Sequence, residues 1–175
     1  MRAPLAIALL VAVLAGGCSG YRFVRREGAL GPVRRIAVEP LRNESYEPGV
    51  EVMVTDALLR EFQRGGGVAV VRDPGRADLV LSGAVLSLVT RSRSFSSIEL
   101  ALEFEVEMGL RLSARRADGS GVEIDPTLLR EWELYLASAD VEAERKNRSE
   151  AIRRLATLLA TRVHDALAET LTTAP

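Results

Sequence analysis

The stretch Ile98–Leu112, IELALEFEVEMGLRL, places an apolar residue at every second position. The positions between them hold mainly glutamate, together with one alanine, one glycine and one arginine. Side chains of a β-strand point alternately to the two faces of a sheet. The pattern therefore predicts one long strand with a buried face and a solvated acidic face, which is typical of an antiparallel sheet covered by helices on one side.

The rest of the chain predicts shorter strands and two helices around this strand. Short apolar or β-branched runs predict strands over 35–39, 68–71, 78–90 and 128–136, with Gly83 as a candidate β-bulge. Apolar residues recur at helical spacing from Val50 to Phe62 and from Ile152 towards Leu171, with Ser149 as the N-cap of the second helix. Polar residues over 91–97 and 138–147 predict loops.

This order of elements indicates an α+β fold. We expect a two-layer sandwich, with two helices packed on one face of a mostly antiparallel sheet of four to five strands. The first strand, the first helix and the second strand can form a right-handed parallel crossover.

The first 18 residues predict secretion and lipid attachment. Arg2, an apolar run over 4–15 and the small pair before Cys18 are typical of a signal peptide. The run is shorter than the roughly 20 residues of a transmembrane helix. The segment LAGGC at 14–18 resembles the bacterial lipobox, in which the cysteine is acylated and becomes the first residue of the mature protein. A simple signal peptide followed by a free cysteine and an uncleaved anchor are the alternatives.

These features divide the chain into three parts. We expect a signal peptide over 1–17, a lipidated Cys18 with a tether over 18–33, and a single α+β domain over 34–172. In enteric bacteria an aspartate after the cysteine commonly retains a lipoprotein in the inner membrane. Ser19 stands there instead, which favours the outer membrane, with the domain on its periplasmic side.

Composition argues against several classes of function. The 23 basic and 24 acidic residues give a net charge of -1, so nucleic acid is not an expected partner. With Cys18 as the single cysteine and His164 as the single histidine, we expect no metal site, no cofactor and no catalytic residues. His164 is expected half-exposed on the last helix, and Trp132 and Phe104 are expected in the core.

Three segments together resemble a known family. They are CSGYRF at 18–23, IAVEPLRN at 36–43 followed by a helix through Leu58 and Phe62, and ADLVLSGAV at 77–85. Their order is similar to the lipopolysaccharide-assembly lipoprotein family, LptE. The resemblance implies a non-catalytic lipoprotein that sits inside the LptD β-barrel of the outer membrane, where the pair inserts lipopolysaccharide into the outer leaflet.

The same resemblance suggests where lipopolysaccharide would bind. Lipopolysaccharide presents phosphates, which require cations at short range, and the acidic face of the long strand would repel them. In the family, cations that contact lipopolysaccharide would fall in the loop before the long strand and in the segment before the last helix. By position alone, the corresponding residues here are Arg91, Arg93, Arg145 and Lys146. Solvated arginines at a strand end would have the same pattern.

Two other functions remain open from the sequence. A periplasmic lipoprotein that regulates a cell-wall synthase or another envelope-assembly machine would share the anchor and the fold class. A lipid-anchored hydrolase would need a pocket that collects several carboxylates.

Overall fold

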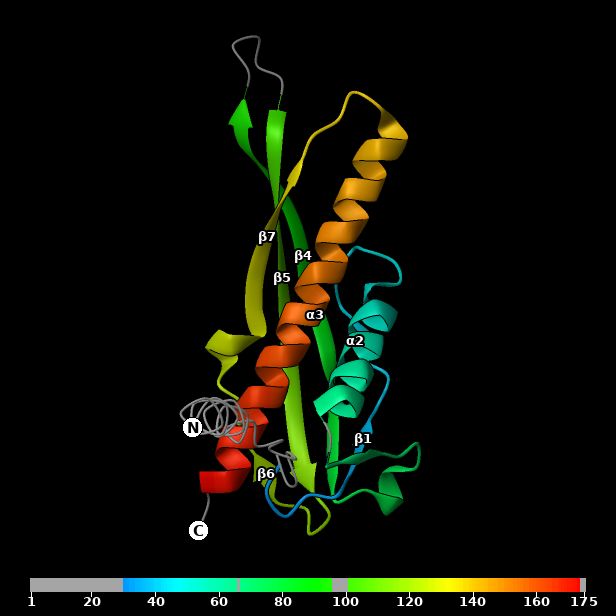
Figure 1. Ribbon diagram of the computed structural model, residues 1–175, viewed down its shortest axis with the longest axis vertical. Helices are drawn as coiled ribbons and strands as arrows, with labels where there is room; N and C mark the ends of the chain where they lie inside the picture. Colours follow the sequence, from blue (N-terminus) through cyan, green and yellow to red (C-terminus); the bar gives the residue numbers. More distant parts are fainter. Residues whose placement is uncertain (1–29, 66, 96–100, 174–175) are drawn as a thin grey trace, which may run out of the picture.

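The computed structural model describes residues 30–65, 67–95 and 101–173. It is elongated, with two helices lying along one face of a long, curled sheet (Figure 1). The elements are β1 (Arg35–Val38), β2 (Arg42–Asn43), α2 (Val50–Gly65), β3 (Ala69–Val70), η1 (Pro74–Arg76), β4 (Leu79–Phe95), β5 (Ala101–Arg116), β6 (Gly121–Val122), η2 (Pro126–Leu129), β7 (Arg130–Leu136) and α3 (Val141–Thr173).

Within the described residues the sheet has seven strands and is mixed. β1 lies between β3 and β4 and is parallel to both, and β2 is also parallel to β4. β4 and β5 form a long antiparallel hairpin, and β6 and β7 pair antiparallel with β5. The predicted α+β class with two helices is confirmed, but the predicted mostly antiparallel sheet of four to five strands is wrong. Strands of two residues, such as β2, β3 and β6, are too short to leave a period in the sequence.

The β4–β5 hairpin is longer than the sequence predicts. β4 continues through Arg91 to Phe95, in the segment predicted as a loop, because Arg91 pairs with Glu105 and Ser94 with Glu103 of β5. The register shifts between Val85 and Ser87, between Ser92 and Ser94, and between Ser94 and Phe95. Each shift increases the local twist of the sheet.

Gly83 is not at a bulge, which corrects the prediction. It pairs in register with Leu112 of β5. A Cβ atom at Gly83 would lie 2.1 Å from the carbonyl oxygen of Arg111, so the close approach of the two strands requires glycine here.

One core fills the space between the helices and the sheet. Its largest side chains are buried on α2 and α3, on the helix-facing side of β4 and β5, and on β1. They include Ile36, Val54, Leu58, Phe62, Leu79, Leu81, Val85, Val106, Met108, Leu155, Leu159, Val163 and Leu167. The apolar positions of the long strand from Phe104 to Leu112 therefore face the helices, as predicted. Ile98 and Leu100, at the start of the predicted strand, lie outside the described residues.

The last helix begins earlier than predicted. α3 starts at Val141, so most of the segment 138–147 is helical and Ser149 lies inside the helix. Asp140 caps it, because its carboxylate accepts hydrogen bonds from the N–H groups of Glu142 and Ala143 over 2.8 and 3.0 Å. These first turns extend beyond the end of α2 (Figure 1). They therefore lack the apolar stripe that predicts a helix with one buried face.

Candidate interaction surface

The orientation of β7 determines which side chains the sheet presents to solvent. Glu131, Glu133 and Tyr135 point towards α3. Arg154 donates to Glu133 over 2.7 Å, and Arg162 forms an ion pair with Glu131. Because side chains alternate along a strand, the apolar residues between these glutamates must face outward.

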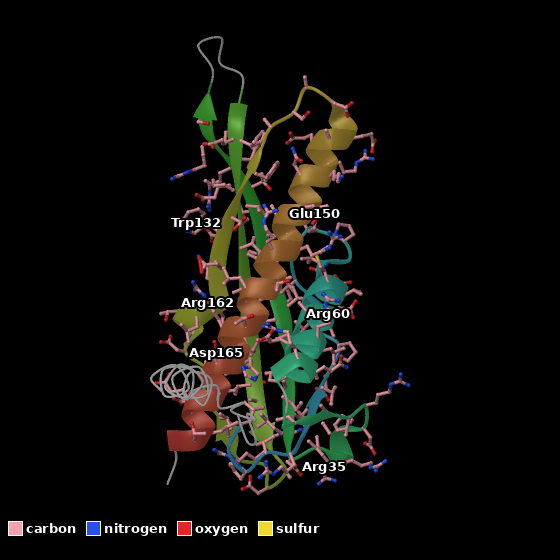
Figure 2. All side chains as sticks on the ribbon, in the orientation of Figure 1. Arg35, Arg60, Trp132, Glu150, Arg162 and Asp165 are labelled. Atoms are coloured by element: carbon pink, nitrogen blue, oxygen red, sulfur yellow. The ribbon has the colours of Figure 1, made fainter. Side chains whose placement is uncertain are left out.

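Trp132 is therefore not in the core, contrary to the prediction. Its side chain is 50% exposed, and Leu134 and Leu136 on the same face of β7 are also exposed. Figure 2 shows Trp132 projecting from β7 on the side away from α2. Val89 of β4 is exposed in the same row across the sheet, since both Val89 and Trp132 pair with Glu107 of β5.

Charged side chains lie between the exposed apolar residues. We call the outward-facing side chains of the upper hairpin and β7 the open face; they are Val89, Arg91, Arg93, Glu103, Glu105, Glu107, Arg130, Trp132, Leu134 and Leu136. Neither of the two described helices covers this face in Figure 1. Exposed apolar residues that gather on one face are typical of an interaction surface, whereas single exposed apolar residues are common on any protein.

Glu105 and Glu107 of the open face are paired with arginines, whereas Glu103 contacts the Ser94 hydroxyl. Arg91 donates to Glu107 over 2.9 Å, Arg130 approaches Glu107 at 3.3 Å, and Arg93 approaches Glu105 at 3.3 Å. The side chains of Glu105 and Glu107 are only 13% and 19% exposed. The predicted solvated acidic face is thus a compact ion-pair network, and the hydrogen bond with Glu107 raises the pKa of Arg91 above its ordinary value.

This combination suits a protein partner. An apolar row with a charge-balanced network can be covered by another protein without burying an isolated charge, which would be costly. Within the described residues, no group of three or more histidine, cysteine or acidic side chains is placed to hold a metal ion. Among the described helices, none has the length and apolar character needed to cross a membrane.

The predicted lipopolysaccharide-contacting residues lie at one end of the molecule but on two layers. Arg91 and Arg93 are on the open face near the end of the hairpin, and Arg145 and Lys146 are in the first turns of α3. Both segments lie at the upper end in Figure 1. Arg145 pairs with Glu142 over 2.9 Å. Cys18, the predicted site of lipid attachment, lies outside the described residues.

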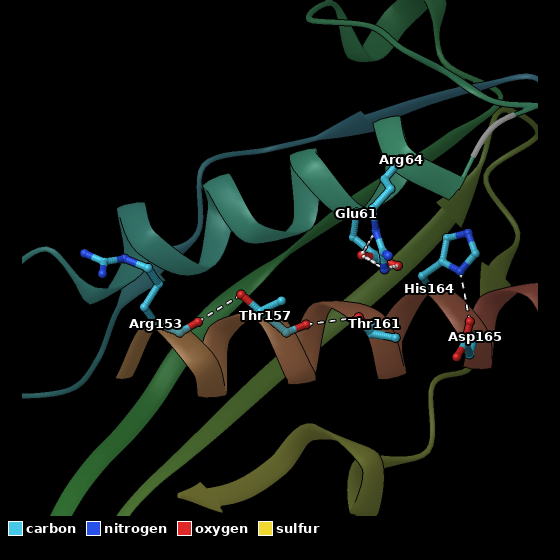
Figure 3. A network of polar contacts seen from close by, with 7 residues as sticks. All are labelled: Glu61, Arg64, Arg153, Thr157, Thr161, His164 and Asp165. Carbon is cyan, nitrogen blue, oxygen red and sulfur yellow. Dashed lines mark hydrogen bonds and ion pairs between the residues drawn. The ribbon is translucent and has the colours of Figure 1, made fainter. Parts of the chain in front are cut away.

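Two buried polar side chains between the helices, His164 and Glu61, were not predicted (Figure 3). His164 is 3% exposed, so the expected half-exposed histidine is wrong. Its ring packs 5.7 Å from that of Phe62, and its Nδ1 lies 3.1 Å from a carboxylate oxygen of Asp165. Nearby, Glu61 is buried and bonded by Arg64.

One sequence signal could have placed His164. The residues four before and three after it, Ala160 and Leu167, both belong to the apolar stripe of the last helix. A residue between them on the same helix face is buried by the same neighbouring elements, so His164 could have been predicted as buried.

Comparisons with known proteins identify relatives of the chain. A family model described as LptE, lipopolysaccharide-assembly, matches residues 33–167. Rare lipoprotein B from Shewanella oneidensis has a similar fold, with a TM-score of 0.51 at 15% identity over 74% of this chain and 94% of that one. A Caulobacter crescentus protein described as a lipoprotein gives a TM-score of 0.52 at 16% identity over 77% and 92% of the two chains. A search of curated protein sequences gives no significant match.

Proposed function

Because the chain belongs to the LptE lipopolysaccharide-assembly family, we propose that it is a non-catalytic outer-membrane lipoprotein that partners an LptD-like β-barrel in the assembly of lipopolysaccharide at the cell surface. Lipid attached to Cys18 would hold it on the periplasmic side of that membrane. The family match supports the role in assembly, and the lipobox-like segment at 14–18 supports the anchor.

The open face is the surface that we assign to the barrel partner. This assignment rests on one observation, the outward row of Trp132, Leu134 and Leu136 on a strand whose two glutamates face the helix. Tryptophan is enriched among the residues that dominate binding energy, and truncating such a residue commonly costs 2 kcal/mol or more, as an order of magnitude. Covering the ion-pair network beside the row would remove paired charges from water, which costs less than removing isolated ones.

A pull-down from solubilised outer membranes tests this proposal. We expect the wild-type chain to retain a barrel protein, identified by its mass, and the variant Trp132→Glu/Leu136→Glu to lose it. Val52→Glu/Val141→Glu is the matched control, because Val52 on α2 and Val141 on α3 are also exposed apolar residues. The control should retain the barrel.

Three results would contradict the proposal in different ways. If a cell-wall synthase is captured in place of a barrel, the chain serves another envelope machine. If the open-face variant keeps the barrel, the contact surface lies elsewhere. If a Cys18→Ser chain is processed normally and still partitions with outer membranes, lipid at Cys18 is not the anchor.

A further inference from the structure

Arginines gather at the end of the molecule opposite to the hairpin tip. This end, which we call the basal end, is formed by the start of β1 and β4, the end of β5, and the loop around η1. The strand register brings these parts together, because Arg35 pairs with Ala69 and Leu79 with Arg116. Figure 2 shows Arg35 at this end, below the helices. Its arginines are Arg34, Arg35, Arg72, Arg76, Arg115 and Arg116.

Most of these arginines have no carboxylate within ion-pair distance among the residues that the structure describes. Elsewhere in the described residues, each arginine except Arg60 lies within ion-pair distance of a glutamate. Among the described residues of the basal end, Arg35 alone has such a partner, Asp78 at 2.7 Å. Arg116 contacts the Ser120 hydroxyl at 3.4 Å and has a longer-range electrostatic interaction with Asp118. The unpaired guanidinium groups are therefore concentrated in one place.

The acidic residues of the basal end do not cancel this charge. Asp73, Asp78 and Asp118 each accept hydrogen bonds from neighbouring backbone N–H groups. These bonds hold Asp73 and Asp118 in turns and tie Asp78 to the start of β1. Six arginines remain against these three aspartates and Glu39, which lines the same depression as Arg72. An excess of exposed cations on one end attracts a negatively charged surface.

The basal end is also where the chain enters the domain. Leu30 is buried in the core, and a Cβ atom at Gly31 would touch the carbonyl oxygen of Leu171 near the end of α3. Only eleven residues, 19–29, separate Leu30 from Cys18. Including the cysteine, such a segment spans at most about 40 Å when fully extended, whereas the 33 residues of α3 span roughly 50 Å. Lipid at Cys18 would therefore keep the basal end nearer the membrane.

We propose that the basal end docks on the phosphate headgroups of anionic phospholipids in the leaflet that holds the lipid anchor. The position of this surface rests on the anchor in the proposed function, whereas its affinity for phosphate rests on the unpaired arginines. Guanidinium groups bind phosphate through paired hydrogen bonds. Docking would fix the orientation of the long axis relative to the membrane, which attachment through a single lipidated residue would not do.

Vesicle flotation of the mature chain with Cys18→Ser tests the arginines without the lipid. This chain keeps the whole core, which runs from Leu30 to Leu171. We expect it to bind vesicles of phosphatidylcholine mixed with phosphatidylglycerol and not vesicles of phosphatidylcholine alone. Binding should weaken at high salt, because the Debye length falls from about 10 Å at 0.1 M to about 3 Å at 1 M.

Charge reversal locates the surface. Arg76→Glu/Arg115→Glu should lower binding to the anionic vesicles by about tenfold or more. The matched control is Arg60→Glu/Lys146→Glu, which changes the net charge equally but lies on the helices, away from the basal end. The control should bind nearly as well as the wild-type chain, and all three proteins should have the same melting temperature.

Three outcomes would overturn the proposal. Equal binding to neutral vesicles would mean that charge does not direct docking. Equal loss in both variants would mean that net charge matters and the basal end does not. The wild-type chain could instead prefer dispersed lipopolysaccharide to anionic vesicles, and Arg76→Glu/Arg115→Glu could lose this preference. That result would assign the arginines to lipopolysaccharide. None of these outcomes affects the barrel pull-down, so the two proposals fail separately.

Discussion

At the scale of single residues, Phe104 and Trp132 test which side of the sheet is buried. Phe104 packs against the core and stacks on Tyr135 with ring centroids 5.3 Å apart, but it is only partly buried. Phe104→Ala should lower the free energy of unfolding by about 2 kcal/mol, below the roughly 3–5 kcal/mol of a fully buried phenylalanine. Trp132→Ala should change it by less than about 0.5 kcal/mol. Urea melts that give equal losses for both variants would contradict the assignment of the two faces.

Gly65 gives a second prediction at this scale. Replacing a helical glycine by alanine usually stabilises a protein by up to about 1 kcal/mol. Here the new Cβ atom would lie 2.6 Å from Nε2 of His164, which is buried between the helices. We expect Gly65→Ala to destabilise the fold by about 1–3 kcal/mol. Adding His164→Ala should recover part of the loss, and strictly additive effects in a double-mutant cycle would show that the two sites do not touch.

At the scale of elements, the loop before α2 is attached to α3 by one ion pair. Arg148 donates to both carboxylate oxygens of Glu47 over 2.8 Å, and this contact lowers the pKa of Glu47 below its ordinary value of 4.5. A carboxylate with a lowered pKa stabilises the fold above its unfolded pKa, and the contribution disappears as the pH falls through the folded pKa.

The pair therefore predicts a pH-dependent effect. Glu47→Gln should lower the free energy of unfolding by about 1 kcal/mol at pH 7, and the urea midpoints of the two proteins should converge as the pH falls below 4.5. Glu142→Gln is the control, because the Glu142–Arg145 pair is largely exposed. A constant difference between Glu47→Gln and the wild-type chain at all pH values would contradict this explanation.

The elements also show what the sequence could predict. The period of Ile98–Leu112 predicted the buried face of β5, because one face of that strand meets two apolar helices. β7 has the same alternation, yet its apolar residues point outward. Arg154 and Arg162 on α3 determine which side chains of β7 point inward, because they form ion pairs with Glu133 and Glu131. Such pairing between distant segments leaves no local period, so the open face could not be predicted from β7 alone.

At the scale of the whole molecule, the two ends offer different cationic surfaces. Arg91 and Arg93 at the upper end are already paired with Glu105 and Glu107, and glutamates in their place would set like charges beside these carboxylates. Arg91→Glu/Arg93→Glu should therefore lower the melting temperature as well as alter ligand binding. Arg145 and Lys146 are exposed in the first turns of α3 and allow a cleaner test.

If lipopolysaccharide binds at the upper end, Arg145→Glu/Lys146→Glu should weaken the binding of purified lipopolysaccharide by about tenfold, since each reversal removes one charge-assisted contact and adds repulsion. The free energy of unfolding should change by less than about 0.5 kcal/mol, because an exposed pair such as Glu142–Arg145 contributes little. Arg76→Glu/Arg115→Glu carries the same change in charge at the basal end and should bind lipopolysaccharide normally. Unchanged binding in Arg145→Glu/Lys146→Glu would exclude the start of α3 as the contact, and the chain would then act in assembly as a structural partner of the barrel.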